Sequence, residues 1–157
     1  LIEDLETVLS KTETDMTIFF RNLSNVSNKL VVPEKDEVSF LDTVFDAFYK
    51  PEEVKGEVLF FWKDWFNRYV ERLQKETKSD TDRKLIMDKI NPKYVLRNYM
   101  SQVAIDAADN GDYSVVDELF SLLKKPYDEQ CDSEKWFVKR PDWARTKVGC
   151  SMLSCSS

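Results

Sequence analysis

The stretch PEEVKGEVLFFWKDWFNRYVERLQ, residues 51–74, repeats its apolar residues at intervals of three and four. This spacing is typical of one face of an α-helix. At about 100° per residue the apolar set falls within roughly 140°, the width of an ordinary buried stripe. The stripe consists of Val58, Leu59, Trp62, Trp65, Phe66, Tyr69, Val70 and Leu73. Since Pro51 and the two glutamates after it suit the first turn of a helix, we predict a helix over residues 52–74.

Two aromatic residues of this stretch, Phe60 and Phe61, lie outside the stripe. They either cover a neighbouring helix of the same domain or face another part of a longer protein. Single exposed aromatic residues are common, so both interpretations stay open.

Similar periodicity continues on both sides of this stretch, without sustained alternation of period two. The predicted fold class is therefore all-α, with about seven helices followed by an irregular C-terminal tail. Before the stretch we expect three helices. The first covers residues 1–9, the second is capped by Asp15, and the third covers residues 38–48. After it we expect three more helices. One covers residues 83–89, and the next covers residues 92–109 with a C-cap at Asn110-Gly111. The last begins at a capping pair, Ser114 and Asp117, and ends before Pro126.

Beyond Pro126 the periodicity fades. We therefore expect two regions, a helical one over residues 1–125 and an irregular tail over residues 126–157. The tail is expected to wrap the surface and to be anchored by Trp136, Phe137 and Trp143.

Composition excludes several kinds of chemistry. The 157 residues include no histidine and only three isolated glycines, so neither a histidine base nor a Gly-rich phosphate loop can be built from them. Three cysteines lack the fourth ligand of a structural zinc site. We predict no catalytic residue, no metal site and no cofactor bound by this chain. A net charge of −6 argues against nucleic acid, and no apolar run is long enough to span a membrane.

The stretch over residues 92–109 has two different faces. Its predicted core stripe is Val95, Leu96, Tyr99, Val103 and Ala107, while Arg97, Ser101, Ala104 and Ala108 form another face. We predict that Arg97 and Asn98 are structural polar anchors that pin loops, because buried polar side chains normally satisfy hydrogen bonds. Direct contact with a nucleotide or substrate is the alternative.

Cys155 is the third residue from the end of the chain and stands between Ser154 and Ser156. Such a position predicts an exposed, mobile thiol, whereas most unpaired cysteines are buried. Within the chain Cys150 is the nearest thiol that could pair with it, and Cys131 could do so if the tail folds back.

Several motifs resemble, in order and spacing, the C-terminal region of the selenoprotein O family. They include residues 91–98, Gly111-Asp112-Tyr113, residues 126–129, residues 140–144, the terminal Cys155-Ser156-Ser157 and the earlier pattern Trp62-x-x-Trp65-x-x-x-Tyr69-x-x-Arg72-Leu73. Members of this family are kinase-like proteins that transfer AMP from ATP to protein hydroxyls. In many animal members the third residue from the end is selenocysteine, where this chain has Cys155.

The resemblance implies a parent protein adenylyltransferase that uses ATP and Mg²⁺ and modifies serine, threonine or tyrosine of protein substrates. Its nucleotide-binding and metal-binding residues match nothing here, so they are expected upstream of Leu1. This part would then support the upstream kinase-like domain. The resemblance also implies redox control through Cys155, paired with a cysteine outside this chain or with Cys150. The expected location is mitochondrial in a eukaryote and cytoplasmic in a bacterium.

Two other functions stay open. One is a free-standing helical module that binds a partner protein through its aromatic surface. The other is a small thiol oxidoreductase, which the lack of a Cys-x-x-Cys motif argues against.

Overall fold

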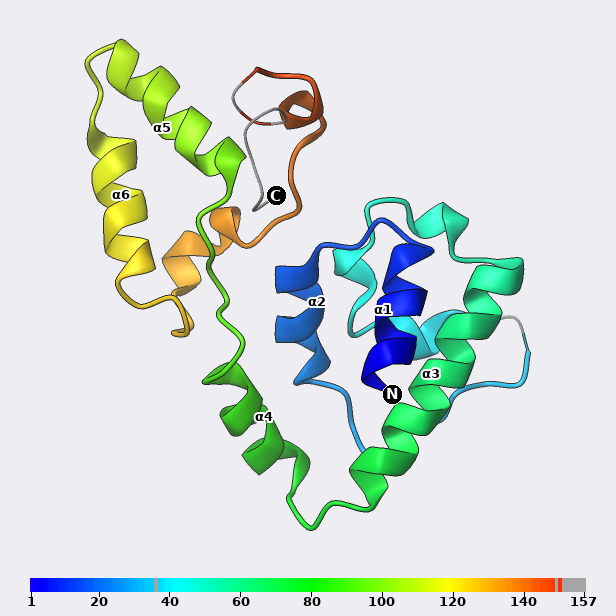
Figure 1. Ribbon diagram of the computed structural model, residues 1–157. Helices are drawn as coiled ribbons and strands as arrows, with labels where there is room; N and C mark the ends of the chain where they lie inside the picture. Colours follow the sequence, from blue (N-terminus) through cyan, green and yellow to red (C-terminus); the bar gives the residue numbers. More distant parts are fainter. Residues whose placement is uncertain (36, 149, 151–157) are drawn as a thin grey trace. The chain divides into compact units, whose positions relative to one another are not determined.

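The computed structural model describes residues 1–35, 37–148 and 150. Within these residues it has six α-helices, five short 3₁₀ segments and no β-strand, which confirms the predicted all-α class (Figure 1). The chain divides into two compact units, Leu1–Asn91 and a second that begins at Pro92. The division expected at residue 125 separates helical from irregular sequence, whereas the compact units divide 34 residues earlier in the chain, between Asn91 and Pro92.

The first unit is built around one long helix. Its elements are α1 (Ile2–Ser10), α2 (Met16–Leu23), η1 (Ser39–Leu41), η2 (Phe45–Ala47), η3 (Pro51–Glu53), α3 (Gly56–Gln74) and α4 (Asp80–Asp88). Helix α3 packs against α1, and every residue of its predicted stripe except the half-buried Val58 is buried. The periodicity of this stretch therefore identified the central helix and its buried face.

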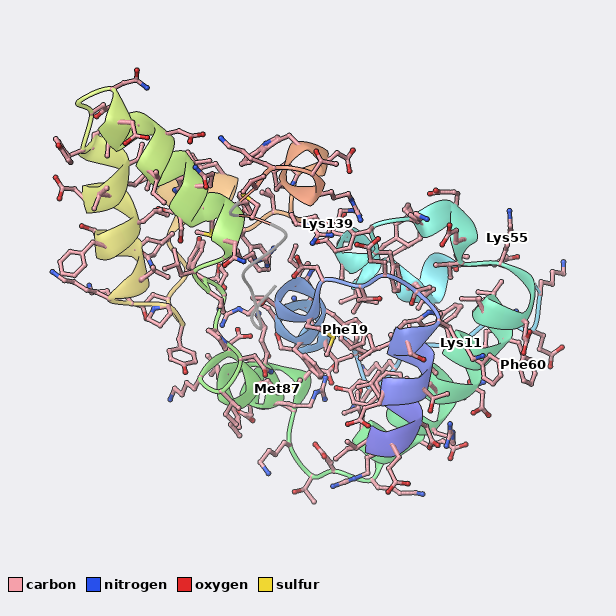
Figure 2. All side chains as sticks on the ribbon, turned by 45° about the horizontal axis from the view of Figure 1, so that its top comes forward. Lys11, Phe19, Lys55, Phe60, Met87 and Lys139 are labelled. Atoms are coloured by element: carbon pink, nitrogen blue, oxygen red, sulfur yellow. The ribbon has the colours of Figure 1, made fainter. Side chains whose placement is uncertain are left out.

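Aromatic side chains fill this core. The ring of Trp62 lies 5.2 Å from that of Phe48 and 5.6 Å from that of Phe19, and Trp65 and Phe66 are 5.2 Å apart, centroid to centroid. Tilted and edge-to-face pairs of this kind add about 0.5–1.5 kcal/mol each beyond the area they bury. Figure 2 labels Phe19 in this interior and Phe60 at the outer edge of α3.

The two residues outside the stripe behave differently. Phe61 is partly buried, and the ammonium of Lys11, just after α1, lies 4.3 Å from the centre of its ring. Phe60 is 65% exposed. Phe61 thus contacts a neighbouring helix end of the same unit.

Caps explain where two of the helices begin. The carboxylate of Asp15 accepts a hydrogen bond from the Ile18 N–H at 3.1 Å, so the predicted cap of α2 is confirmed. Helix α4 begins at Asp80, earlier than expected, because the hydroxyl of Ser79 accepts from the Asp82 N–H. This satisfies an N–H that has no partner inside the helix.

The α-helix expected over residues 38–48 is wrong. This stretch forms the short 3₁₀ turns η1 and η2, and at its end the chain becomes extended at Phe48. There Asp15 N–H donates to the Ala47 carbonyl at 2.8 Å and Tyr49 N–H donates to Glu13 at 2.9 Å. Backbone pairing with a segment more than 30 residues away therefore holds the end of this stretch in an extended conformation, and the residues before it form only 3₁₀ turns.

Helix α3 also begins later than expected, at Gly56 instead of residue 52. Residues 51–53 form the separate turn η3, and Gly56 has a φ of +55°. Glycine adopts a positive φ without the steric cost that a side chain brings, so the chain turns into the helix at this residue.

The second unit contains α5 (Asn98–Asp109), α6 (Ser114–Leu123), η4 (Cys131–Trp136) and η5 (Asp142–Arg145). Helices α5 and α6 pack side by side (Figure 1). The predicted C-cap of α5 is confirmed, because Gly111 has a φ of +81° and its N–H donates to the Ala108 carbonyl at 2.8 Å. The predicted capping pair of α6 is wrong: Ser114 is already helical, and its N–H donates to the carboxylate of Asp112.

Helix α5 begins at Asn98, six residues later than expected. The N–H groups of Lys93 and Tyr94 both donate to the Pro126 carbonyl, at 2.8 and 3.1 Å, which holds this stretch out of the helix. Val95 and Leu96 are consequently 40% and 48% exposed, so their predicted place in the core stripe is wrong.

The C-terminal segment, defined as residues 126–148 and 150, contributes to the core of this unit. The core consists of Tyr94, Tyr99, Met100, Ala104, Leu119, Leu122, Trp136, Ala144 and Cys150. Of the three expected anchors, Trp136 is buried, Phe137 packs against the core, and Trp143 is 43% exposed with its ring 6.4 Å from that of Tyr99. The segment therefore packs into the unit and does not only wrap its surface.

Candidate functional site

The start of α5 brings together three of the residues singled out in the sequence. Arg97 precedes the first residue of the helix, and its guanidinium donates to the Val138 carbonyl at 2.9 Å. The side-chain amide of Asn98 donates to the Cys150 carbonyl at 3.3 Å. Both side chains thus contact main-chain carbonyls of the C-terminal segment. Cys155 lies outside the described residues.

Cys150 and Cys131 are both free thiols, and they differ in exposure. Cys150 is 2% exposed and belongs to the core of the second unit, while its N–H donates to the Lys147 carbonyl at 3.1 Å. Cys131, at the start of η4, is exposed. A reagent in water therefore has access to Cys131 in the folded unit, but not to Cys150.

A buried lysine, Lys93, precedes Arg97 and Asn98 in the same motif, but the sequence alone assigned it no role. Lys93 is 6% exposed, and its ammonium forms ion pairs with Glu129, at 2.6 Å, and with Glu134. Desolvation lowers the pKa of Lys93, but hydrogen bonds and charge attraction from both carboxylates outweigh it, so the pKa lies above its ordinary value. The two glutamates follow Lys93 in the sequence by 36 and 41 residues. Spacing patterns within a helix or strand cannot predict ion pairs over such separations.

Tyr94, the next residue, ties the segment to the end of α6. Its hydroxyl donates to the Gln130 carbonyl at 3.1 Å, and burial raises its pKa. The amide of Gln130 in turn donates to the carbonyls of Leu122 and Lys125, at 3.1 and 2.8 Å. These carbonyls lie at the end of a helix, where the chain itself supplies no partner.

Two further ion pairs connect the helices with the segment. Glu118 of α6 accepts from the Trp136 indole N–H at 2.8 Å and pairs with Lys135, and the hydrogen bond from Lys135 lowers the pKa of the Glu118 carboxyl. Asp106 of α5 pairs with Lys147, which lowers the pKa of that carboxyl. Because most of these groups are exposed, each pair adds little stability.

Arg21 is one of the buried cations of the first unit and is 3% exposed. Its guanidinium donates to the carbonyls of Asp88 and Asn91, at 2.8 and 3.0 Å, and lies 3.6 Å from the Asp88 carboxylate. The hydroxyl of Ser24 donates to the same carboxylate at 2.7 Å. Arg21 thus holds α2 against the end of α4.

Chemically, these arrangements bind main-chain carbonyls and compensate buried charges. Over residues 1–35, 37–148 and 150, no group of three or more His, Cys, Asp or Glu side chains could hold a metal ion. In the same part of the chain, no helix is long and apolar enough to cross a membrane. What the described polar residues do is hold segments of the chain in place.

Comparison with known proteins gives a consistent picture. A family model described as "Protein adenylyltransferase SelO" matches residues 1–124. Over its whole length the chain is 60% identical to "Protein nucleotidyltransferase YdiU" of Flavobacterium johnsoniae, and 43% and 41% identical to proteins of the same name from Rhodopirellula baltica and Aromatoleum aromaticum. The chain spans between 28% and 30% of the length of these curated relatives.

Proposed function

Because this chain belongs to the protein adenylyltransferase SelO family, we propose that it is the C-terminal helical portion of an enzyme that transfers AMP from ATP to serine, threonine or tyrosine hydroxyls of proteins. The observation that carries the proposal is 60% identity, along the whole chain, to a protein nucleotidyltransferase. ATP and Mg²⁺ would be bound by the rest of the enzyme, since this chain has no Gly-rich loop to cradle a phosphate.

The role of this part, in our proposal, is to support the kinase-like domain of the enzyme and to carry a redox cysteine. Arg97 and Asn98 would be structural anchors, which is supported by their hydrogen bonds to main-chain carbonyls of the C-terminal segment. The partners would be that upstream domain and the protein substrates. The relatives named above are bacterial, which supports a cytoplasmic over a mitochondrial location.

We propose Cys155 as the redox thiol, with a partner outside this chain in preference to Cys150. The burial of Cys150 supports this choice, because a disulfide requires the two Cα atoms to lie within about 7 Å and both sulfur atoms to meet. Cys150 would have to leave the core of its unit to react. A bond that closes a long loop also constrains the chain more than one between residues five apart.

The test compares AMP transfer by the full-length enzyme and its Cys155→Ser variant across a series of thiol–disulfide buffers, with peptide mapping of the disulfides. The wild type should respond to the redox potential, and the variant should not. Cys131→Ser is the matched control and should behave as the wild type. If Cys155 stays fully alkylatable under oxidising conditions and the variant responds as the wild type does, the redox role is refuted.

A second experiment tests where the nucleotide binds. We expect no saturable heat when ATP and Mg²⁺ are titrated into the 157-residue chain alone, whereas the full-length enzyme should bind. Saturable binding by the chain alone would place nucleotide contacts in this part and refute the assignment.

A further inference from the structure

The turn between α5 and α6 carries a pair of residues that reacts with itself in a flexible chain (Figure 1). Asn110-Gly111 is the only Asn-Gly pair among the 157 residues, and both of its residues are exposed. In such a pair the backbone nitrogen of the glycine can attack the side-chain carbonyl carbon of the asparagine, because glycine has no side chain to shield its nitrogen. The function proposed above does not use this turn.

The reaction has two steps. A bond forms between the Gly111 nitrogen and Cγ of Asn110, while the bond from Cγ to the side-chain nitrogen breaks. The leaving nitrogen takes up the proton of the Gly111 N–H and departs as ammonia, which leaves a succinimide ring. Water then opens this ring at one of its two carbonyls, so position 110 becomes either aspartate or isoaspartate.

The structure holds the reacting atoms away from this chemistry. The Gly111 N–H donates to the Ala108 carbonyl at 2.8 Å, and the side-chain amide of Asn110 donates to the Asp106 carbonyl at 2.7 Å. With a ψ of 9°, Asn110 also places the Gly111 nitrogen nearly eclipsed with its own backbone nitrogen, whereas the ring requires it to be eclipsed with Cβ. Ring formation therefore requires a rotation about the Cα–C bond of Asn110 that breaks the hydrogen bond of Gly111.

Further hydrogen bonds close the turn on both sides. The Asp112 N–H donates to the Ala107 carbonyl at 3.0 Å, which together with the bond of Gly111 forms a glycine C-cap at the end of α5. The carboxylate of Asp112 accepts from the Ser114 N–H at 2.9 Å and so holds the start of α6. Rotation at Asn110 displaces these groups as well, so it occurs only when the turn opens.

We propose that Asn110 is a site of spontaneous deamidation, and that opening of the α5–α6 turn sets its rate. The product also weakens the turn. A carboxylate at position 110 cannot donate to the Asp106 carbonyl, and it adds a negative charge at the C-terminal end of α5, where the helix dipole is already negative. Deamidation therefore marks molecules in which this turn has opened. This inference goes beyond the proposed function and does not depend on it.

The experiment incubates the full-length protein in mildly alkaline buffer, with and without denaturing urea, and follows the peptide that contains Asn110 by mass spectrometry. In urea the mass increase of deamidation should appear. The folded protein should react at least about tenfold more slowly, because its reaction waits for the turn to open. Asn110→Gln is the control and should lose the mass increase, since glutamine would have to form a larger ring.

Asp112→Ala tests the control by the turn. This variant removes the hydrogen bond at the start of α6 and leaves the reacting atoms unchanged. It should speed deamidation of the folded protein at least about threefold, the effect expected for loss of a helix cap. In urea it should react like the wild type, because no turn remains there to open.

Asn110→Asp reproduces the aspartate product. Amide hydrogen exchange at the end of α5 should be at least about threefold faster in this variant than in the wild type. Equal deamidation rates in the folded protein and in urea overturn the proposal, as does a mass increase that persists in Asn110→Gln. It is also overturned if Asp112→Ala leaves the rate in the folded protein unchanged, or if Asn110→Asp leaves the exchange unchanged.

Discussion

The buried Lys93 and its two glutamates make an asymmetric prediction about stability. In the double variant Glu129→Gln/Glu134→Gln the ammonium of Lys93, 6% exposed, loses both of its counter-charges. In Lys93→Met the apolar stem is kept, and the two carboxylates that remain have side chains that are 55% and 52% exposed, so water can solvate them. Removal of the glutamates should therefore be the more damaging change.

The magnitudes follow from what each variant leaves in the protein. An uncompensated buried charge costs about 3–5 kcal/mol when it is sealed from water, and we expect about 2–4 kcal/mol here because both glutamates adjoin solvent. Lys93→Met should change the unfolding free energy by no more than about 1 kcal/mol, since replacing a buried charge by an apolar side chain is often close to neutral. Lys125→Met, at an exposed lysine, is the control and should change little.

The raised pKa of Lys93 adds a dependence on pH. A folded-state pKa above the ordinary 10.5 means that the charged lysine stabilises the fold fully below that value. The contribution is lost as the pH rises through the folded-state pKa. The difference in stability between the wild type and Lys93→Met should therefore be constant around neutral pH and change only in strongly alkaline solution.

The assay is the denaturant dependence of amide hydrogen exchange in peptides from α5 and α6 of the full-length protein, which reports the unfolding free energy of this unit. The double glutamine variant should lower it more than Lys93→Met does. If Lys93→Met proves the more destabilising of the two, compensation of a buried charge is not what this cluster provides.

Three further predictions concern other contacts. Arg21→Lys should destabilise the first unit by about 2 kcal/mol in urea unfolding, because lysine cannot reproduce two guanidinium hydrogen bonds to carbonyls; a variant as stable as the wild type would contradict this. Asp15→Ala should lower the unfolding free energy by about 1 kcal/mol in the same assay, whereas Asp15→Asn, which can still cap α2, should stay close to the wild type. An Asp15→Ala variant as stable as the wild type would show that this cap does not stabilise the unit. Asn98→Ala should speed alkylation of Cys150 at least about tenfold in timed maleimide labelling, while Cys131 keeps its rate as an internal reference; equal Cys150 rates would rule out Asn98 as an anchor.

The sequence by itself determined the features that depend on neighbours along the chain. The apolar spacing over residues 58–73 predicted α3 and its buried face, because that spacing is a direct consequence of helix geometry. The caps at Asp15 and Gly111 were equally readable, since each satisfies or redirects backbone groups within a few residues. The motifs that resemble the selenoprotein O family identified the family that the comparisons then showed.

Tertiary structure decided what depends on distant partners. Residues 92–97 have the composition of a helix start, but the Pro126 carbonyl accepts hydrogen bonds from the N–H groups of Lys93 and Tyr94 and keeps these residues out of the helix. Residues 47–49 likewise pair with the backbone of residues 13–15 instead of continuing a helix. The ion pairs of Lys93 could not be predicted either, since each joins residues more than 30 positions apart. A buried charge or backbone group is stable only with a partner, and only the folded chain determines which partner is near.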